Sequence, residues 1–271
     1  MKIAHDPFLL SKVVCEVRYK QGYRYLDVCG QTLVEIEKSM EGWEAREVQV
    51  QSGRLENAGV SMEFVFSAAN AALTQNTRLD DEQVAWIEDD EPFKKHAHVL
   101  FSKIIDAVQP TAFTRRGIRF IDLRGVEAVP DGLKLLQQSP ILRLGQGQAE
   151  KILDRRVVGE SIVLRAEDET RGTRIGVGVY RRSKSVFTEE FSPEDIAQAR
   201  MRPPHTEGTG QVEKMKDYAK WRHEIQRDPK IAIVVDLDCY ERNEIPKLEI
   251  GEFIAWGYEE RKRLLTTLFP G

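Results

Sequence analysis

The stretch RRGIRFID at residues 115–122 has the spacing best suited to bind an anion. On a β-strand, side chains alternate between faces, so Arg115, Gly117 and Arg119 share one face. Because Gly117 has no side chain, it would leave a shallow groove between two guanidinium groups, which pair well with phosphate or carboxylate. We therefore predict an anion-binding surface here. The alternative is that both arginines pair with acids on neighbouring strands.

Arginine is concentrated around this strand. Residues 115–182 carry 12 of the 24 Arg and a net charge of +5, against −6 for residues 1–114 and −3 for residues 183–271. Arg156 and Arg174 lie on the predicted strands that follow, and we add both to the candidate ligand-binding residues. An electropositive sheet of this kind could bind a nucleotide or the backbone of a nucleic acid. Nearby acids could also neutralise it.

Two carboxylates alternate on a later predicted strand. Asp236 and Asp238 would lie about 7 Å apart on one face, and paired carboxylates can bind Mg²⁺ or act as acid and base. Glu16 and Asp122, on other predicted strands, could converge with them. That arrangement would suit a metal-dependent nuclease or phosphoesterase. The sequence contains no phosphate-binding loop, zinc motif or nucleophile elbow, and we predict no cofactor.

Hydrophobic periodicity predicts the elements that position these residues. Strands are predicted at residues 13–20, 47–51, 60–66, 113–123, 151–158, 160–166, 174–182 and 230–240. Helices are predicted at residues 26–40, 92–108, 130–138 and 249–268, and the segment 68–77 fits either a strand or a short helix. Few helices separate the strands, which favours antiparallel sheets and an α+β fold.

The order of predicted elements occurs twice. We therefore predict two pseudo-repeated halves, residues 1–110 and 111–271, each with an antiparallel sheet and a long helix packed on one face. Residues 183–229 do not fit this order, and we interpret them as a helical insertion between the last two strands. Tyr218 and Trp221 lie on an amphipathic pattern within it and are candidate partner-binding residues.

Composition excludes several classes of protein. The 271 residues are 41% hydrophobic and 31% charged, which is typical of a soluble globular chain. No apolar run reaches the length of a membrane span, and no signal peptide is evident. The three cysteines, Cys15, Cys29 and Cys239, have no paired spacing, so we expect reduced thiols and a cytoplasmic protein. A protein partner or a homo-oligomer is expected, without a membrane.

The sequence RRGIRFID resembles the Arg-x-Gly-x-Arg-aromatic-Ile signature of a sporadically distributed, uncharacterised bacterial protein family of about this length. The strands VVCEVRY and VVDLDCY and the terminal helix FIAWGYEERKRLLTTLF are similar to segments of that family. Arg116 and Asp122 depart from its pattern, which has an apolar residue and an asparagine there. The resemblance implies a common fold. The sporadic distribution implies a role in a defence or mobile-element cassette.

We predict a non-enzymatic binding component, an adaptor or sensor that uses the arginine-rich sheet or the insertion to hold an anionic ligand or a partner protein. The alternative is the metal-dependent nuclease or phosphoesterase centred on Asp236 and Asp238. Acids that converge in one cleft would favour the enzyme. A flat sheet with ion-paired arginines would favour the binding protein.

Overall fold

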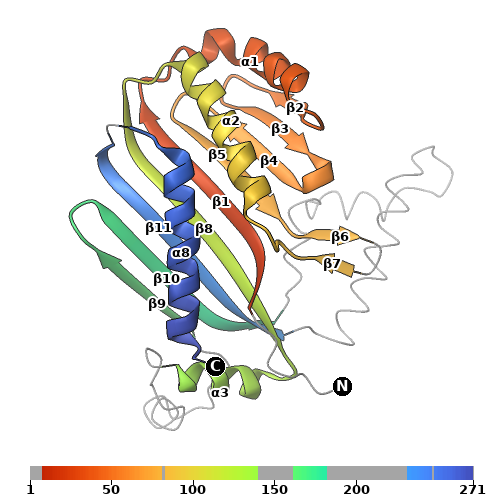
Figure 1. Ribbon diagram of the computed structural model, residues 1–271, viewed down its shortest axis with the longest axis vertical. Coiled ribbons are helices and arrows are strands. Elements are labelled where there is room, and N and C mark those ends of the chain that lie inside the picture. Colours follow the sequence, from red (N-terminus) through yellow and green to blue (C-terminus); the bar gives the residue numbers. More distant parts are fainter. Residues whose placement is uncertain (1–7, 81–82, 140–160, 182–230, 246, 271) are drawn as a thin grey trace, which may run out of the picture.

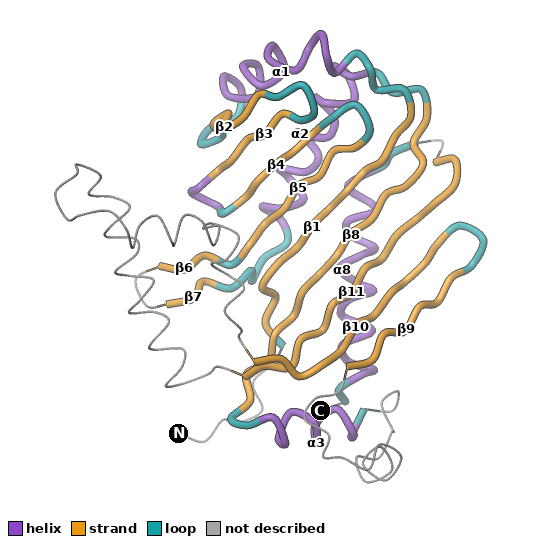
Figure 2. The backbone as a smooth tube through the Cα atoms, turned by 180° about the vertical axis from the view of Figure 1, so that it is seen from behind, coloured by secondary structure: helices purple, strands orange, loops and turns teal. Residues whose placement is uncertain are grey.

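A computed structural model describes residues 8–80, 83–139, 161–181, 231–245 and 247–270. Its main feature is a nine-stranded sheet in the order β2-β3-β4-β5-β1-β8-β11-β10-β9, in which every neighbouring pair is antiparallel (Figure 2). The strands are β1 (Leu9–Lys20), β2 (Glu44–Val48), β3 (Gly53–Asn57), β4 (Met62–Phe66), β5 (Asn70–Asn76), β8 (Ala112–Val126), β9 (Ser161–Glu167), β10 (Arg171–Arg181) and β11 (Ile231–Ile245). A separate hairpin joins β6 (Arg78–Asp80) to β7 (Gln83–Ala85).

The described residues form four α-helices. Helices α1 (Tyr25–Ser39), α2 (Glu91–Val108) and α8 (Ile250–Leu268) lie on one face of this sheet, and α3 (Val129–Gln138) lies at one end of it (Figure 1). In the view from behind, the strands lie in front of the helices (Figure 2), and no described helix covers that second face. The predicted α+β class is confirmed. Among the described helices, none is both long and apolar enough to span a bilayer.

The core lies between the sheet and the helices, because the strands alternate and the helices are amphipathic. On β1, Val13, Cys15 and Val17 are fully buried against the helices, while the residues between them face the opposite side. The same alternation holds along β11. All three cysteines are free and buried. Burial raises the pKa of the Cys239 thiol to about 12, so it stays protonated.

The two predicted halves do not have separate sheets. Strand β1, from the first half, pairs with β8, from the second half, along nearly the whole of β1 (Figure 1). The predicted boundary near residue 110 therefore lies between α2 and β8, at a point that does not interrupt the sheet.

Several secondary-structure elements have other limits in the structure than the sequence predicts. The strand predicted at residues 47–51 is β2, which ends at Val48 because residues 49–52 form the hairpin turn, where the Gln49 amide donates to the Ser52 carbonyl at 2.9 Å. The ambiguous segment 68–77 contains strand β5, which pairs with both β1 and β4. The strand predicted at 151–158 and the insertion predicted at 183–229 lie outside the described residues.

Candidate functional site

The two sets of residues singled out from the sequence meet on the open face of the sheet, opposite the helices. Strands β8 and β11 are neighbours, and their register places Arg119 across from Asp238 and Gly117 across from Tyr240. The predicted alignment of Arg115, Gly117 and Arg119 on one face is therefore confirmed. Asp236 and Asp238 share that same face.

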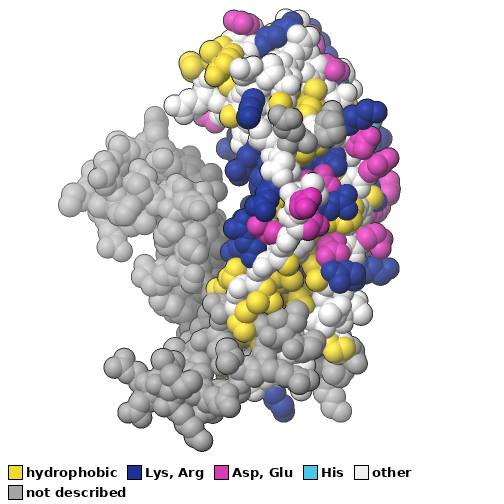
Figure 3. All heavy atoms as spheres, turned by 90° about the vertical axis from the view of Figure 1, so that its left-hand side faces the viewer, with side chains coloured by type: hydrophobic (Ala, Val, Ile, Leu, Met, Phe, Trp, Pro, Cys, Tyr) yellow, Lys and Arg dark blue, Asp and Glu magenta, His cyan; other side chains and the backbone are white. Residues whose placement is uncertain are grey.

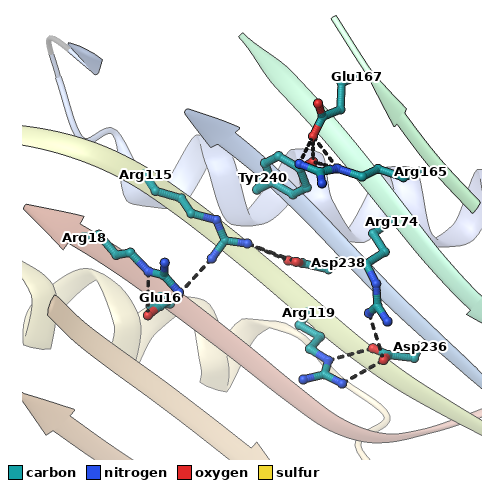
Figure 4. A network of polar contacts seen from close by, with 10 residues as sticks. All are labelled: Glu16, Arg18, Arg115, Arg119, Arg165, Glu167, Arg174, Asp236, Asp238 and Tyr240. Carbon is teal, nitrogen blue, oxygen red and sulfur yellow. Dashed lines mark hydrogen bonds and ion pairs between the residues drawn. The ribbon is translucent and has the colours of Figure 1, made fainter. Parts of the chain in front are cut away.

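Arg115 occupies the groove predicted at Gly117. Its guanidinium donates from Nη1 to Glu16 Oε2 at 2.9 Å and from Nη2 to Asp238 Oδ2 at 3.0 Å. A Cβ on Gly117 would lie 3.2 Å from the guanidinium carbon. Arg115 also lies over the Tyr240 ring, 5.1 Å from its centroid. The groove expected there is thus filled by the chain itself, since Arg115 turns across the glycine towards two carboxylates (Figure 4).

Arg119 and Arg174 meet at Asp236. Arg119 forms a two-pronged pair with this carboxylate, from Nε to Oδ1 at 2.6 Å and from Nη2 to Oδ2 at 2.7 Å. Arg174 reaches the same Oδ2 from β10, at 3.4 Å. Asp236 therefore links an arginine from each strand beside β11 (Figure 4).

Further ion pairs extend this network to both sides. On β1, Arg18 donates to Glu16 at 3.0 Å. On β9, Arg165 and Glu167 contact each other and the Tyr240 hydroxyl, which donates to Glu167. We call this surface the arginine face. It comprises Glu16, Arg18, Arg115, Arg119, Arg165, Glu167, Arg174, Asp236, Asp238 and Tyr240 (Figure 4).

The arginine face has two levels of depth. The side chain of Arg119 is 49% exposed and that of its partner Asp236 is 20% exposed. Arg18 is 54% exposed and Glu16 is 21% exposed. The carboxylates thus lie deeper than Arg18 and Arg119, whose guanidinium groups point outward. Arg115, at 23% exposed, lies as deep as its two carboxylate partners. In Figure 3, which views the molecule from the left-hand edge of Figure 1, Lys and Arg side chains gather in a column and Asp and Glu side chains lie beside them.

The network also sets the protonation of its members. Burial raises the pKa of Asp238, and Arg115 and Arg119 oppose that rise. The hydrogen bond to Asp236 raises the pKa of Arg119 further, so this guanidinium stays charged.

Two further carboxylates were expected to converge on Asp236 and Asp238. Glu16 does so, through the Arg115 that it shares with Asp238. Asp122 does not, because alternation along β8 turns it to the helix side, where it is fully buried and accepts hydrogen bonds from Arg261 of α8.

A metal ion at the two aspartates would have to compete with arginines. Both carboxylates accept hydrogen bonds from guanidinium groups. Within the described ranges, no group of three or more His, Cys, Asp or Glu side chains is placed to hold a metal ion. The other candidate residues, Arg156, Tyr218 and Trp221, lie outside the described residues.

Sequence reasoning missed a second charged cluster, on the helix side of the sheet. Arg116 is buried there and pairs with Glu241, which also accepts a hydrogen bond from Arg171. The sequence did contain a signal for this cluster. Arg116 occupies a position on β8 where the alternation of the strand places buried, mostly apolar residues such as Ile118 and Phe120. Arg116 and Asp122, which depart from the resembled family pattern, are thus both buried and ion-paired.

Fold and site together define an α+β protein whose single large sheet carries helices on one side and a network of arginines and carboxylates on the other. No protein-family model matches the chain, and a search of curated proteins gives no match. The resemblance drawn from RRGIRFID stays a prediction.

Proposed function

We propose that the chain is a binding protein and that the arginine face binds an anionic partner through backbone phosphates. The observation that carries the proposal is the two-level arrangement, in which partly buried carboxylates orient guanidinium groups, most of which remain about half exposed. Arginines held in this way have lost side-chain freedom before binding, which lowers the entropic cost of contact with a partner. The face carries five arginines and four acids, and Arg242 adds a further cation beside Glu167.

A nucleic-acid duplex is the partner whose chemistry fits best. The arginines span strands β1, β8, β10 and β9, so they form a row across the sheet. The one aromatic side chain of the arginine face, Tyr240, lies between Arg115 and Arg165 and is buried, so it offers no ring for base stacking. Contacts would therefore be made to phosphates, independent of sequence and sensitive to salt.

The test is binding of a labelled DNA duplex by fluorescence anisotropy over a range of salt concentrations. The variant Arg119→Ala/Arg174→Ala should weaken binding and reduce the slope of log K against log salt by about 2, because each phosphate contact contributes about 0.9. Arg263→Ala is the matched control, since this arginine is also exposed and ion-paired but lies on α8. It should bind like the wild type.

Two results would count against the proposal. One is a wild-type protein that does not bind the duplex, and the other is an unchanged salt slope in the double variant. Cleavage of the duplex that requires Mg²⁺ and is lost in Asp238→Asn would instead support the alternative function, a metal-dependent nuclease or phosphoesterase. The role as an adaptor or sensor in a defence or mobile-element cassette follows only from the resemblance and stays a prediction.

We also propose that residues 1–110 and 111–271 are structural pseudo-repeats. From the centre of the sheet outward, one half contributes β1, β5, β4, β3 and β2, and the other contributes β8, β11, β10 and β9. In each half the central strand comes first along the chain, and a long helix, α2 or α8, follows the last strand. This order supports a repeat that has merged into one sheet.

A further inference from the structure

A pocket of about 640 Å³ lies at one end of the sheet, where the β9–β10 turn, the end of β11 and the connection to α8 meet. Its lining includes the cationic residues Arg116, Arg171, Arg242 and Lys247 and the acidic residues Glu241 and Glu249. These side chains therefore carry two more positive than negative charges. The volume lies within the range of about 300–1,000 Å³ that is typical of small-molecule sites.

Glu241 fixes two of the cations and is itself neutralised by them. Its Oε2 accepts from Arg116 Nε at 2.7 Å, and its Oε1 accepts from Arg171 Nε at 2.8 Å. Arg116 also donates to the Leu248 carbonyl. Because both carboxylate oxygens are engaged, Glu241 orients the guanidinium groups and leaves an excess of positive charge in the pocket.

Aromatic rings of α8 support the same two guanidinium groups. Arg116 lies 4.8 Å from the centroid of the Phe253 ring, and Arg171 lies 4.8 Å from that of Trp256. Stacking on a ring fixes the plane of a guanidinium. The pocket thus contains two arginines that are oriented before any ligand arrives.

The remaining cations lie nearer the rim. Arg242 pairs with Glu167 at 2.9 Å. Lys247 is exposed and forms no ion pair with any residue in the described part of the chain. Helix α8 begins at Ile250, directly after Glu249, so the positive end of its dipole lies beside this lining, where the carboxylates of Glu249 and Glu252 partly offset it.

We infer that this pocket binds a phosphomonoester of about the size of a nucleoside monophosphate. A phosphomonoester carries a charge of about −1.5 to −2 near neutral pH, which matches the excess charge of the lining. Oriented arginines suit its oxygens. The two oriented arginines of this pocket are distinct from the arginine face, since Arg116 lies on the opposite side of the sheet from Arg115 and Arg119. Only Arg242, at the rim, also contacts that face, through Glu167. The inference does not depend on the proposed function.

The test is isothermal titration calorimetry of the full chain with AMP, adenosine and inorganic phosphate. We expect AMP to bind more tightly than phosphate, and adenosine not to bind. Lys247→Ala and Arg171→Ala should each weaken AMP binding about tenfold or more, because each removes a charged donor. Lys247 is exposed, so its variant should fold normally.

Two control variants locate the site. Lys38→Ala removes an exposed cation on α1, and Arg119→Ala/Arg174→Ala alters only the arginine face. Both should bind AMP like the wild type. The inference is overturned if AMP does not bind, if adenosine binds as tightly as AMP, or if Lys247→Ala and Arg171→Ala leave the affinity unchanged. Loss of AMP binding in Arg119→Ala/Arg174→Ala would place the ligand on the arginine face instead.

Discussion

The buried pair of Asp122 and Arg261 gives the sharpest prediction about stability. Asp122 on β8 is fully buried, and Arg261 of α8 donates to both of its oxygens, from Nε at 2.9 Å and 3.1 Å and through a further bond from Nη2. The Arg261 side chain is only 18% exposed. This pair is therefore a charged link between the sheet and the helix layer, in surroundings where water screens little.

Arg261→Met would leave the Asp122 carboxylate buried without a counter-charge. Removing one partner of a buried ion pair costs about 3–5 kcal/mol, whereas replacing both partners with apolar residues of similar size is often close to neutral. We therefore expect Arg261→Met to lower the free energy of unfolding by about 3–5 kcal/mol. The double variant Asp122→Leu/Arg261→Met should recover most of that loss.

Equilibrium unfolding in guanidinium chloride, carried out on the complete double-mutant cycle, measures the coupling between the two residues. Arg263→Met is the control, because it breaks an exposed pair with Glu260 on the same helix and should cost at most about 1 kcal/mol. The reasoning fails if Arg261→Met costs no more than this control. It also fails if the double variant is as unstable as Arg261→Met alone.

Two further predictions concern packing and pH. A Cβ on Gly257 would overlap Ile118, so Gly257→Ala should lower the free energy of unfolding by about 1–3 kcal/mol in a denaturant titration. Gly251 lies in the same helix with open space around it, so Gly251→Ala should raise the free energy of unfolding by about 0.4–1 kcal/mol. Equal effects of the two substitutions would refute the close approach of α8 to β8. Burial lowers the pKa of His96, whose Nδ1 accepts an indole N–H at 3.1 Å, so the folded state favours the neutral ring. The free energy of unfolding should therefore fall as pH drops from about 6.5 through the lowered pKa. Thermal unfolding across this range should show less decline for His96→Gln than for the exposed control His98→Gln, and identical profiles would contradict the assignment.

Much of the fold could be predicted because alternation and helical periodicity are local signals. The helix predicted at 92–108 corresponds to α2, and the strand predicted at 113–123 lies within β8. The joining of both halves into one sheet could not be predicted, because the pairing of β1 with β8 depends on contacts far apart in the sequence. Residue spacing predicts which face of a strand a side chain lies on, but it does not predict which other strand pairs with that strand.

The site was predicted in part for the same reason. Arg115 and Arg119 were correctly predicted to share one face of their strand, as were Asp236 and Asp238. The alternative that the arginines pair with acids on neighbouring strands was also stated. The particular partners were not, since Arg119 meets Asp236 only through the register of β8 against β11. The second cluster, around Arg116 and Glu241, depends on the contact of α8 with the sheet, which no local pattern specifies.

The measurement that tests the arginine face most directly is an NMR titration of the arginine Nε–Hε signals with a DNA duplex. The account predicts that the signals of Arg119, Arg165 and Arg174 shift as duplex is added, while that of Arg263 on α8 stays in place. A shift confined to Arg263, or no shifts in the presence of duplex, would contradict the claim that the oriented arginines of the open sheet face form the binding surface.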